Sequence, residues 1–381
     1  MVRRLVVDAA IPLAEEAFSR FGTVELVPGR EITAAHVAGA DALVVRSVTR
    51  VDAALLVDSA VRFVGTATIG TDHLDIPWLE SAGVRWASAA GCNARSVVEY
   101  VLSATGAWCA QHERGFAGLR LGIVGHGNIG SRLAPVARAL GITVSVCDPP
   151  LERAGKLSDA VALETILAEC DVVTLHVPYT RSGPDATHHL LDTERLALLH
   201  RPALLINAAR GAAINNAALL TFMMAGGQAN VALDVFEGEP APNQRLVERC
   251  WLATPHIAGY SHEGKTNGTT MMAAALAAHF GEPHTFAPSL PEPEPSRLDL
   301  AGATGLPALR RTMALAYDIA EDDGNLRRGL GLDQEGWGRH FDGLRRGYRQ
   351  RREFANYTIT GAGDTETARL LMELGFLLKT P

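Results

Sequence analysis

The sequence predicts an α/β protein in which two parallel sheets are each covered by helices. Over the first ninety residues, short apolar runs alternate with segments of helical pattern. A second series of the same kind begins near residue 121, with a glycine-rich G-x-G-x-x-G turn at Gly125, Gly127 and Gly130. Hydrophobic residues make up 47% of the chain, enough for buried cores. Continuous apolar strands separated by helices are typical of parallel sheets that are buried on both faces.

Length and composition narrow the class further. A chain of 381 residues is expected to form two or three domains. Its formal net charge of −7 gives no electrostatic reason to expect nucleic-acid or membrane binding. Its five cysteines are scattered without a C-x-x-C pair, which indicates a reduced, cytoplasmic chain with no zinc site and no disulfide framework. The N-terminus carries acids and a proline where a signal peptide needs an apolar run, and no run reaches the ~20 residues of a membrane span.

The first series of elements is read from its apolar runs. Strands are expected at 5–8, 42–47 and 61–68, with helices at 12–22 and 52–60. A long helix is expected to follow at 91–110. Parallel strands of this kind present their working residues at their carboxyl ends.

The second series starts at the glycine-rich turn and closes near Thr254. Its strands are expected at 121–124, 143–148, 171–177, 203–209 and 229–235, and a helix is expected at 266–280. The stretch 281–296 holds five prolines and is interpreted as a linker. Beyond it, helices at 307–322, 336–353 and 364–374 and a strand at 356–360 predict a small α+β unit. Its basic segment is expected on one helix, which would carry Arg345, Arg346, Arg349, Arg351 and Arg352.

The glycine-rich turn predicts a dinucleotide site, because it follows an expected strand and opens an expected helix. Gly125 permits the tight turn, Gly127 lets the backbone approach a pyrophosphate, and Gly130 lets the helix pack closely. Asp148 ends the next strand, about 20 residues after the first glycine. A carboxylate there binds ribose hydroxyls and repels a 2′-phosphate, which favours NAD over NADP. Pro135 falls inside the expected helix, where it should cause a kink or remove a hydrogen bond.

Three polar residues follow expected strands of the second series: Arg210, Glu239 and His256. Carboxyl ends of parallel strands face one crevice, so we expect the three to converge. A histidine can take the hydroxyl proton of an alcohol, a carboxylate can hold that histidine, and an arginine can grip a carboxylate substrate. Each residue alone also allows a plain interpretation, as a surface arginine, a solvated acid or a structural histidine.

Four segments resemble the D-isomer-specific 2-hydroxyacid dehydrogenase family over roughly residues 5–280: 65–75, 206–219, 232–240 and 254–260. The resemblance implies that His256 is the acid–base residue, Glu239 its partner, Arg210 the substrate-orienting residue and Asp234 a neighbour of the nicotinamide. It also implies a Rossmann NAD-binding domain (93–256) inserted in a flavodoxin-like substrate domain (1–92 and 257–282), with the active site between them. A linker (283–296) and a C-terminal dimerisation domain (297–381) would follow.

A narrower resemblance rests on 45–49, 91–101 and 256–265, with the linker and the arginine-rich C-terminal unit. It points to the branch of the family that oxidises 4-phospho-D-erythronate at C2 to 2-oxo-3-hydroxy-4-phosphobutanoate, in the biosynthesis of pyridoxine 5′-phosphate (vitamin B6). It implies that Ser47, Thr68 and Tyr260 bind substrate. The cofactor residues that it implies, with those of the glycine-rich turn and the strand ends, are Gly125, Gly127, Asn128, Ile129, Gly130, Asp148, Val177, Ala208, Ala209, Arg210, Asp234 and Gly259.

Two further points concern the substrate and the partners. Arg46, beside Ser47, is expected to contact the phosphate, although an ion pair inside the first domain is an alternative. At position 177 many relatives carry threonine, so a contact by Val177 would be apolar or through its backbone. The expected assembly is a homodimer through the C-terminal domain, whose arginines could reach the partner's substrate, with no metal, nucleic acid or membrane. Remaining alternatives are a related dehydrogenase acting on 3-phosphoglycerate or on glyoxylate and hydroxypyruvate, and a non-catalytic NAD-sensing protein.

Overall fold

The computed structural model describes residues 2–199 and 203–379, and the chain divides into two compact units. The first unit comprises 1–93 and 261–291, and the second comprises 94–260 and 292–381. The first unit is therefore discontinuous in sequence, with residues 94–260 inserted between its two parts. The family resemblance implies an insertion of this kind.

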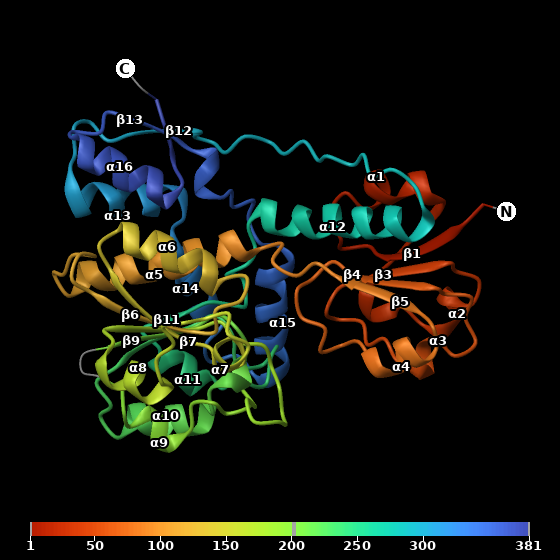
Figure 1. Ribbon diagram of the computed structural model, residues 1–381, viewed down its shortest axis with the longest axis horizontal. Helices are drawn as coiled ribbons and strands as arrows, with labels where there is room; N and C mark the ends of the chain where they lie inside the picture. The colour runs from red at the N-terminus through yellow and green to blue at the C-terminus, as the bar shows by residue number, and fades with distance from the viewer. Residues whose placement is uncertain (1, 200–202, 380–381) are drawn as a thin grey trace. The chain divides into compact units, whose positions relative to one another are not determined.

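The first unit is built on a parallel sheet with the order β2-β1-β3-β4-β5 (Figure 1). Its strands are β1 (Arg4–Asp8), β2 (Thr23–Val27), β3 (Ala42–Val45), β4 (Phe63–Thr66) and β5 (Arg85–Ser88). The central strands β3 and β4 are buried along their length, whereas the edge strands β2 and β5 are partly exposed. This strand order is that of flavodoxin-like sheets, as expected.

Helices cover both faces of that sheet. On one face α1 (Ala14–Phe18) and α12 (His262–Phe280) share a buried cluster with the strands, in which Met272 and Leu276 pack with Leu5 and Phe63. The helix α12 thus returns the chain to the first unit after the insertion (Figure 1). The opposite face is covered by α2 (Ala34–Val37), α3 (Ala53–Leu56) and α4 (Ile76–Ser81), with 3₁₀ turns at Ser19–Phe21 and Gly29–Glu31 completing the unit.

The second unit holds a parallel sheet with the order β11-β10-β9-β8-β6-β7. Its strands are β6 (Arg120–Val124), β7 (Thr143–Cys147), β8 (Val172–Leu175), β9 (Leu204–Asn207), β10 (Asn230–Leu233) and β11 (Leu252–Ala253). The chain leaves β6 to one side for β7 and then returns to its other side for β8, so the sheet changes direction there. Ligands of open α/β sheets bind at such a switch point, and the glycine-rich turn follows β6.

The helices of this sheet are placed by the connections between strands. They are α5 (Ala94–Gln111), α6 (Gly130–Ala139), α7 (Pro149–Arg153), α8 (Leu163–Glu169), α9 (Thr193–Leu196), α10 (Asn216–Met224) and α11 (Gln244–Arg249), with a 3₁₀ turn at Gly211–Ala213. Pro135 lies inside α6, which continues past it as a helix. None of the helices in the described ranges combines the length and the apolar character that crossing a bilayer requires.

The C-terminal segment forms a small α+β layer of the second unit. Its strands β12 (Arg297–Asp299), β13 (Thr358–Thr360) and β14 (Leu377–Leu378) make a parallel sheet in that order. Its helices are α13 (Gly305–Ala316), α14 (Ile319–Arg327), α15 (Gln334–Arg346) and α16 (Thr365–Leu374), with a 3₁₀ turn at Phe354–Asn356. Many apolar residues of this segment, including Met313 and Phe354, share a buried cluster with Trp108 and Phe116, whereas Leu326, Trp337 and Phe341 of α14 and α15 belong to a second cluster of the same unit.

The C-terminal segment, expected as a dimerisation domain, also packs against the rest of its own chain. α13 packs on α5 and α16 packs on α6, so the segment completes the core of its own chain (Figure 1).

Two expected helices of this segment are also different. The helix expected at 307–322 is two helices, because Tyr317 is extended and the Asp318 side chain caps α14 by accepting from the Ala320 and Glu321 N–H groups. The helix expected at 336–353 ends at Arg346, followed by Gly347. The expectation of one basic helix was therefore wrong: of its five arginines only Arg345 and Arg346 are helical, and Arg351 and Arg352 are buried.

Candidate active site

The glycine-rich turn between β6 and α6 fits the close approach of a dinucleotide. Gly125 has φ +96°, and a Cβ on it would lie 2.5 Å from the His176 carbonyl oxygen. A Cβ on Gly130 would overlap the Gly125 carbonyl oxygen. A Cβ on Gly127, in contrast, would meet no protein atom within 4 Å. The packing of the chain explains the first two glycines, whereas the space at Gly127 is left for a ligand.

Asp148 ties this turn to the end of β7. Its Oδ2 accepts the backbone N–H of His126 at 2.8 Å, and its Oδ1 accepts that of Leu151 at 3.1 Å as the cap of α7. The carboxylate is partly exposed. It is therefore fixed beside the glycine-rich turn, where a ribose of a bound dinucleotide is expected.

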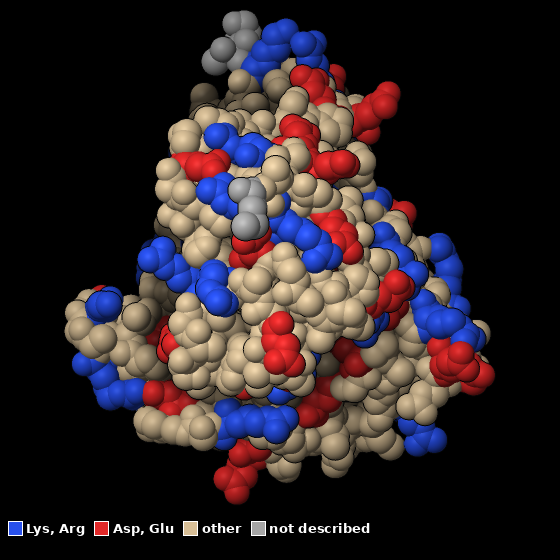
Figure 2. Space-filling view, turned by 90° about the vertical axis from the view of Figure 1, so that its right-hand side faces the viewer, with Lys and Arg blue, Asp and Glu red and all other residues tan. Residues whose placement is uncertain are grey.

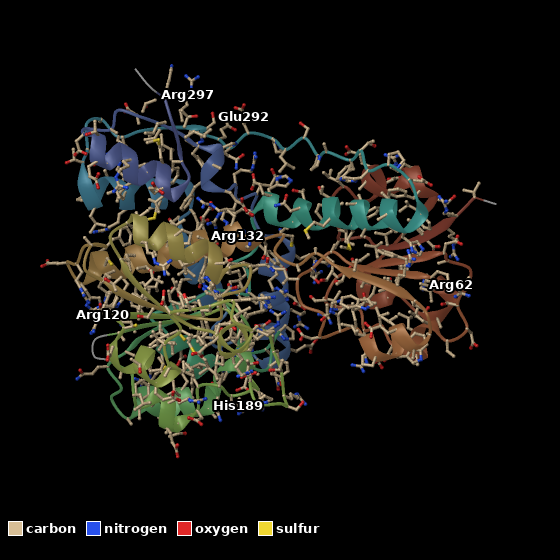
Figure 3. All side chains as sticks on the ribbon, viewed as in Figure 1. Arg62, Arg120, Arg132, His189, Glu292 and Arg297 are labelled. Carbon is tan, nitrogen blue, oxygen red and sulfur yellow. The ribbon has the colours of Figure 1, made fainter. Side chains whose placement is uncertain are left out.

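The other expected cofactor residues line strand ends of the same sheet. Asn128 and Ile129 precede α6, and Arg132, labelled in Figure 3, donates from its first turn to the Asn128 carbonyl oxygen. Val177 follows β8, and its side chain lies next to the position that a Cβ on Gly125 would take. The Ala209 N–H donates to Asn207 Oδ1 at 3.1 Å. Ala208, directly after β9, and Gly259, in a turn, are both half-buried.

His256 and Glu239 form a hydrogen-bonded pair in the second unit. His256 Nδ1 and Glu239 Oε2 are 2.8 Å apart, and the side chains are 36% and 21% exposed. The other Glu239 oxygen accepts the Phe236 N–H at 2.9 Å. Burial by itself raises the pKa of Glu239, but His256 and these hydrogen bonds outweigh it and hold the pKa below its usual value. The ionised carboxylate therefore accepts from Nδ1–H, which leaves Nε2 as the basic nitrogen.

Asp234 holds the turn that carries His256. Its Oδ1 accepts from the Thr254 hydroxyl at 2.7 Å and the Ile257 N–H at 2.8 Å, and its Oδ2 accepts from the Ala258 N–H at 2.9 Å. Burial raises the pKa of this carboxyl, and His256 together with these three donors opposes that rise. The turn needs such support because His256 itself has φ +56°, a conformation that is costly for a non-glycine residue.

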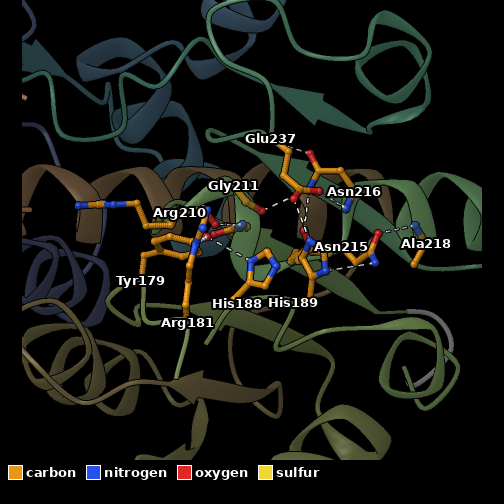
Figure 4. A network of polar contacts seen from close by, with 12 residues as sticks. Tyr179, Arg181, His188, His189, Arg210, Gly211, Asn215, Asn216, Ala218 and Glu237 are labelled. Atoms are coloured by element: carbon orange, nitrogen blue, oxygen red, sulfur yellow. Dashed lines mark hydrogen bonds and ion pairs between the residues drawn. The ribbon is translucent and has the colours of Figure 1, made fainter. Parts of the chain in front are cut away.

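Arg210 follows β9 in a turn that is locked to the Glu239 loop. Gly211 makes the lock possible, because a Cβ there would overlap the Phe236 backbone. Figure 4 shows Glu237 between Asn216 and His189: its N–H donates to Asn216 Oδ1 at 3.0 Å, and its carboxylate lies 2.8 Å from His189 Nε2. The sequence alone gave no signal for this network, which fixes the loops of Arg210 and Glu239 to one another.

In the first unit, the expected substrate residues follow β3 and β4. Arg46 forms an ion pair with the buried Asp8, Nε to Oδ2 at 3.0 Å, which is the alternative considered for it. Within the described residues the two terminal nitrogens of Arg46 have no protein partner. The ion pair therefore orients the guanidinium and leaves these two nitrogens available to a ligand. Ser47 is exposed, and Thr68 lies 2.8 Å from the Thr66 hydroxyl, which His73 also contacts.

Tyr260 of the second unit is contacted by the C-terminal segment. Arg345 Nη2 donates to its hydroxyl at 3.1 Å, and Tyr348 packs edge-on against its ring. The arginine-rich C-terminal segment therefore contacts its own chain, at a residue beside the turn that carries His256.

Comparisons with known proteins agree with this fold and with a dinucleotide site. A family model described as the NAD-binding domain of D-isomer-specific 2-hydroxyacid dehydrogenases matches residues 94–258, and a model described as a domain of unknown function matches 289–375. Among solved structures, D-lactate dehydrogenase of Aquifex aeolicus with NAD and lactic acid is 23% identical, with a TM-score of 0.60 over 73% of this chain and 96% of that one. NAD-bound 3-phosphoglycerate dehydrogenase of Entamoeba histolytica is 22% identical, with a TM-score of 0.64 over 74% and 96%. At these identities the likeness shows the fold.

Fold, glycine-rich turn and histidine–carboxylate pair together define an NAD-dependent oxidoreductase of the D-isomer-specific 2-hydroxyacid dehydrogenase class. Curated relatives identify the family within this class. Erythronate-4-phosphate dehydrogenases of Klebsiella pneumoniae (strain 342) and Sodalis glossinidius (strain morsitans) are 45% and 47% identical to this chain over 98% of each chain. The chain belongs to the erythronate-4-phosphate dehydrogenase family.

Proposed function

We propose that this protein oxidises 4-phospho-D-erythronate at C2 to 2-oxo-3-hydroxy-4-phosphobutanoate, a step in the biosynthesis of pyridoxine 5′-phosphate. The observation that carries the proposal is the His256–Glu239 pair, in which Nδ1 and Oε2 are 2.8 Å apart. The chain that holds this pair aligns over 98% of its length with an erythronate-4-phosphate dehydrogenase. Bound NAD supplies the hydride acceptor for the C2 hydrogen.

His256 acts as the base in this proposal. Its Nε2 takes the C2 hydroxyl proton as the hydride leaves, and the imidazolium that forms donates from Nδ1–H to Glu239. The carboxylate stabilises the imidazolium and fixes the ring orientation. Asp234 acts as a positioning residue, because it holds the turn on which His256 stands.

We assign the two anionic ends of the substrate to different arginines. Arg210 binds the substrate carboxylate, for which a guanidinium offers two parallel donors. Arg46, oriented by Asp8, binds the phosphate with Ser47, Thr68 and Tyr260. The proposed cofactor contacts are the residues of the glycine-rich turn and strand ends described above, with Asp148 at the ribose.

The domain boundaries and the assembly are part of the proposal. We assign 1–92 and 257–282 to the substrate domain, 93–256 to the NAD-binding domain, 283–296 to the linker and 297–381 to a dimerisation domain. A homodimer is supported by apolar side chains that the C-terminal segment exposes: Leu315 (52%), Met372 (53%) and Leu377 (53%). Burying such side chains between subunits is favourable.

We further propose that the protein works in the cytoplasm without nucleic-acid partners. Its cysteines are free thiols, at Cys92, Cys109, Cys147, Cys170 and Cys250. On the face shown in Figure 2, basic and acidic side chains are interspersed, whereas a nucleic-acid surface gathers basic ones.

The test is a comparison of hydride donors. Purified protein is given NAD with 4-phospho-D-erythronate, D-erythronate, 3-phosphoglycerate or glycerate, and kcat/KM is measured from NADH absorbance. We expect the first compound to be preferred by at least about 10²-fold, since a site built for a phosphate leaves buried donors unpaired without it. Equal values for all four acids would refute the substrate assignment, and absence of turnover with any of them would favour a non-catalytic role.

A further inference from the structure

Arg345 stands on the last turn of α15, in the segment that matches a domain of unknown function. Its guanidinium reaches Tyr260, four residues beyond His256, with Nη2 3.1 Å from the hydroxyl and the guanidinium carbon 5.8 Å from the ring centre. It also interacts electrostatically with Glu239. The C-terminal segment thus brings a cation to the catalytic pair of its own chain.

The guanidinium has more donors than the protein satisfies. Its side chain is only 19% exposed, and its Nε is buried with no hydrogen-bond partner among the described residues. The nearest carboxylate pairing is Asp342, whose Oδ1 is 3.7 Å from Nη1, too far for a hydrogen bond. Burying a charged donor without an acceptor is costly, so this guanidinium can gain free energy from an acceptor that a ligand brings.

Neighbouring side chains fix the position of this cation. Tyr348 packs edge-on against the Tyr260 ring, with centroids 5.9 Å apart, and its hydroxyl donates to the buried Asp322 at 2.7 Å. Arg349 pairs with the other Asp322 oxygen at 2.5 Å. The two tyrosine rings beside Arg345 are therefore held in place by polar contacts among residues of the second unit alone.

Charge balance favours an anion at this place. Glu239 is committed to His256, and when His256 is protonated the two neutralise each other. Arg345 then keeps a charge that Asp342 offsets only at 3.7 Å. A phosphate monoester carries about two negative charges at neutral pH, and one guanidinium neutralises only half of that.

We infer that Arg345 binds the phosphate of the substrate and supplies a cation to it in addition to the one proposed for Arg46, so that the C-terminal segment takes part in binding the anion in the chain that carries it. The inference rests on the proposed function, because it takes the substrate to be a phosphorylated 2-hydroxy acid. It differs from the expectation that these arginines act on a partner's substrate.

The test compares Arg345→Gln with Arg346→Gln, a matched control on the neighbouring exposed residue of the same helix. For Arg345→Gln we expect kcat/KM with 4-phospho-D-erythronate to fall about 10²-fold, the effect of one charged hydrogen-bond donor, while the value with unphosphorylated D-erythronate stays within about threefold. Arg346→Gln should leave both values unchanged. The affinity for NAD, measured by fluorescence, should be the same in all three proteins.

A second variant and a second probe guard against misfolding. Arg345→Lys keeps the charge but loses the planar fork, and we expect it to lose about tenfold with the phosphorylated acid. Inorganic phosphate, used as a competitive inhibitor, should bind more weakly to Arg345→Lys than to wild type and equally well to Arg346→Gln.

The outcomes separate the inference from the function on which it rests. Equal losses with both acids would overturn the inference, because Arg345 would then act on the catalytic pair or on folding. An unchanged inhibition constant for phosphate would overturn it as well. If wild type itself fails to prefer the phosphorylated acid, the proposed function fails, and that result is visible before any variant is made.

Discussion

At the scale of single residues, the chemistry depends on how His256 is held. Glu239 contacts its Nδ1, and Asp234 accepts three hydrogen bonds from the turn around it. The backbone at His256 is in the left-handed region, so the turn would relax without these contacts. The two carboxylates therefore do different work, one on the imidazole and one on the backbone.

For His256→Ala we predict a loss of at least about 10²-fold in kcat, the usual contribution of a general base. The Kd for NAD should stay within about twofold, because the glycine-rich turn and Asp148 are held by other contacts. Steady-state kinetics and cofactor titration measure the two effects. A variant that keeps the wild-type kcat would show that His256 is not the base.

Replacing Glu239 by Gln should change the pH dependence of oxidation. The imidazolium that forms when His256 takes the proton loses its carboxylate partner, so the plateau of the kcat/KM profile should fall. Glutamine does not ionise, so any change of rate that follows the titration of Glu239, whose pKa is held below its usual value, should disappear from the acid side of the profile. A profile with the wild-type shape would mean that Glu239 does not act on His256.

The sequence could predict this site only in part. Motif segments place Arg210, Glu239 and His256 after strands of one sheet, and the structure joins Glu239 to His256, whereas the role of Arg210 stays a prediction. The network of Asn216, Glu237 and His189 joins residues 21 to 48 positions apart and carries no local pattern. The sequence also could not predict that Asp8 is the buried partner of Arg46, because this pairing depends on which strands are neighbours in the fold.

At the scale of elements, most of the strands expected from sequence are buried ones. The strands missed are β2, β5, β11, β12 and β14: β11 has only two residues, and the residues of the other four are partly exposed and show no continuous apolar run. Edge strands need fewer apolar residues, because only part of their surface is covered. Helix ends were missed where a polar side chain decides them, as Asp318 does for α14.

Two glycines of the turn before α6 make a matched pair for an element-scale prediction. Gly130→Ala forces a methyl group onto the Gly125 carbonyl oxygen and should destabilise folding by about 1–3 kcal/mol. Gly127→Ala meets no protein atom and should leave the unfolding free energy unchanged or slightly higher, while weakening NAD binding at least about tenfold. Denaturant unfolding and cofactor titration of both variants test this. Full NAD affinity in Gly127→Ala would place the cofactor away from this turn.

At the scale of the whole chain, the C-terminal segment belongs to the core of the second unit. Trp108 and Phe116 are buried in the same cluster as Met313, Phe354 and Phe376. The sequence suggested an appendage because a proline-rich stretch precedes it. Composition reveals a linker but not which surface the next segment covers.

Truncation and assembly can be separated experimentally. A chain ending at Glu282 should be strongly destabilised, because it exposes the apolar side of α5 and α6, and thermal unfolding should show this. The full chain should give a light-scattering mass of twice 40.5 kDa. A truncated chain with the wild-type Tm would contradict the packing, and a full-length mass of one chain would contradict the homodimer.

The most direct test of the central claim follows the hydrogen at C2. The protein is incubated with NAD and 4-phospho-D-erythronate carrying deuterium at C2, and the NADH formed is analysed by mass spectrometry. The account predicts one deuterium in each NADH molecule, together with a carbonyl at C2 of the product. NADH without deuterium, or no NADH at all, would contradict it.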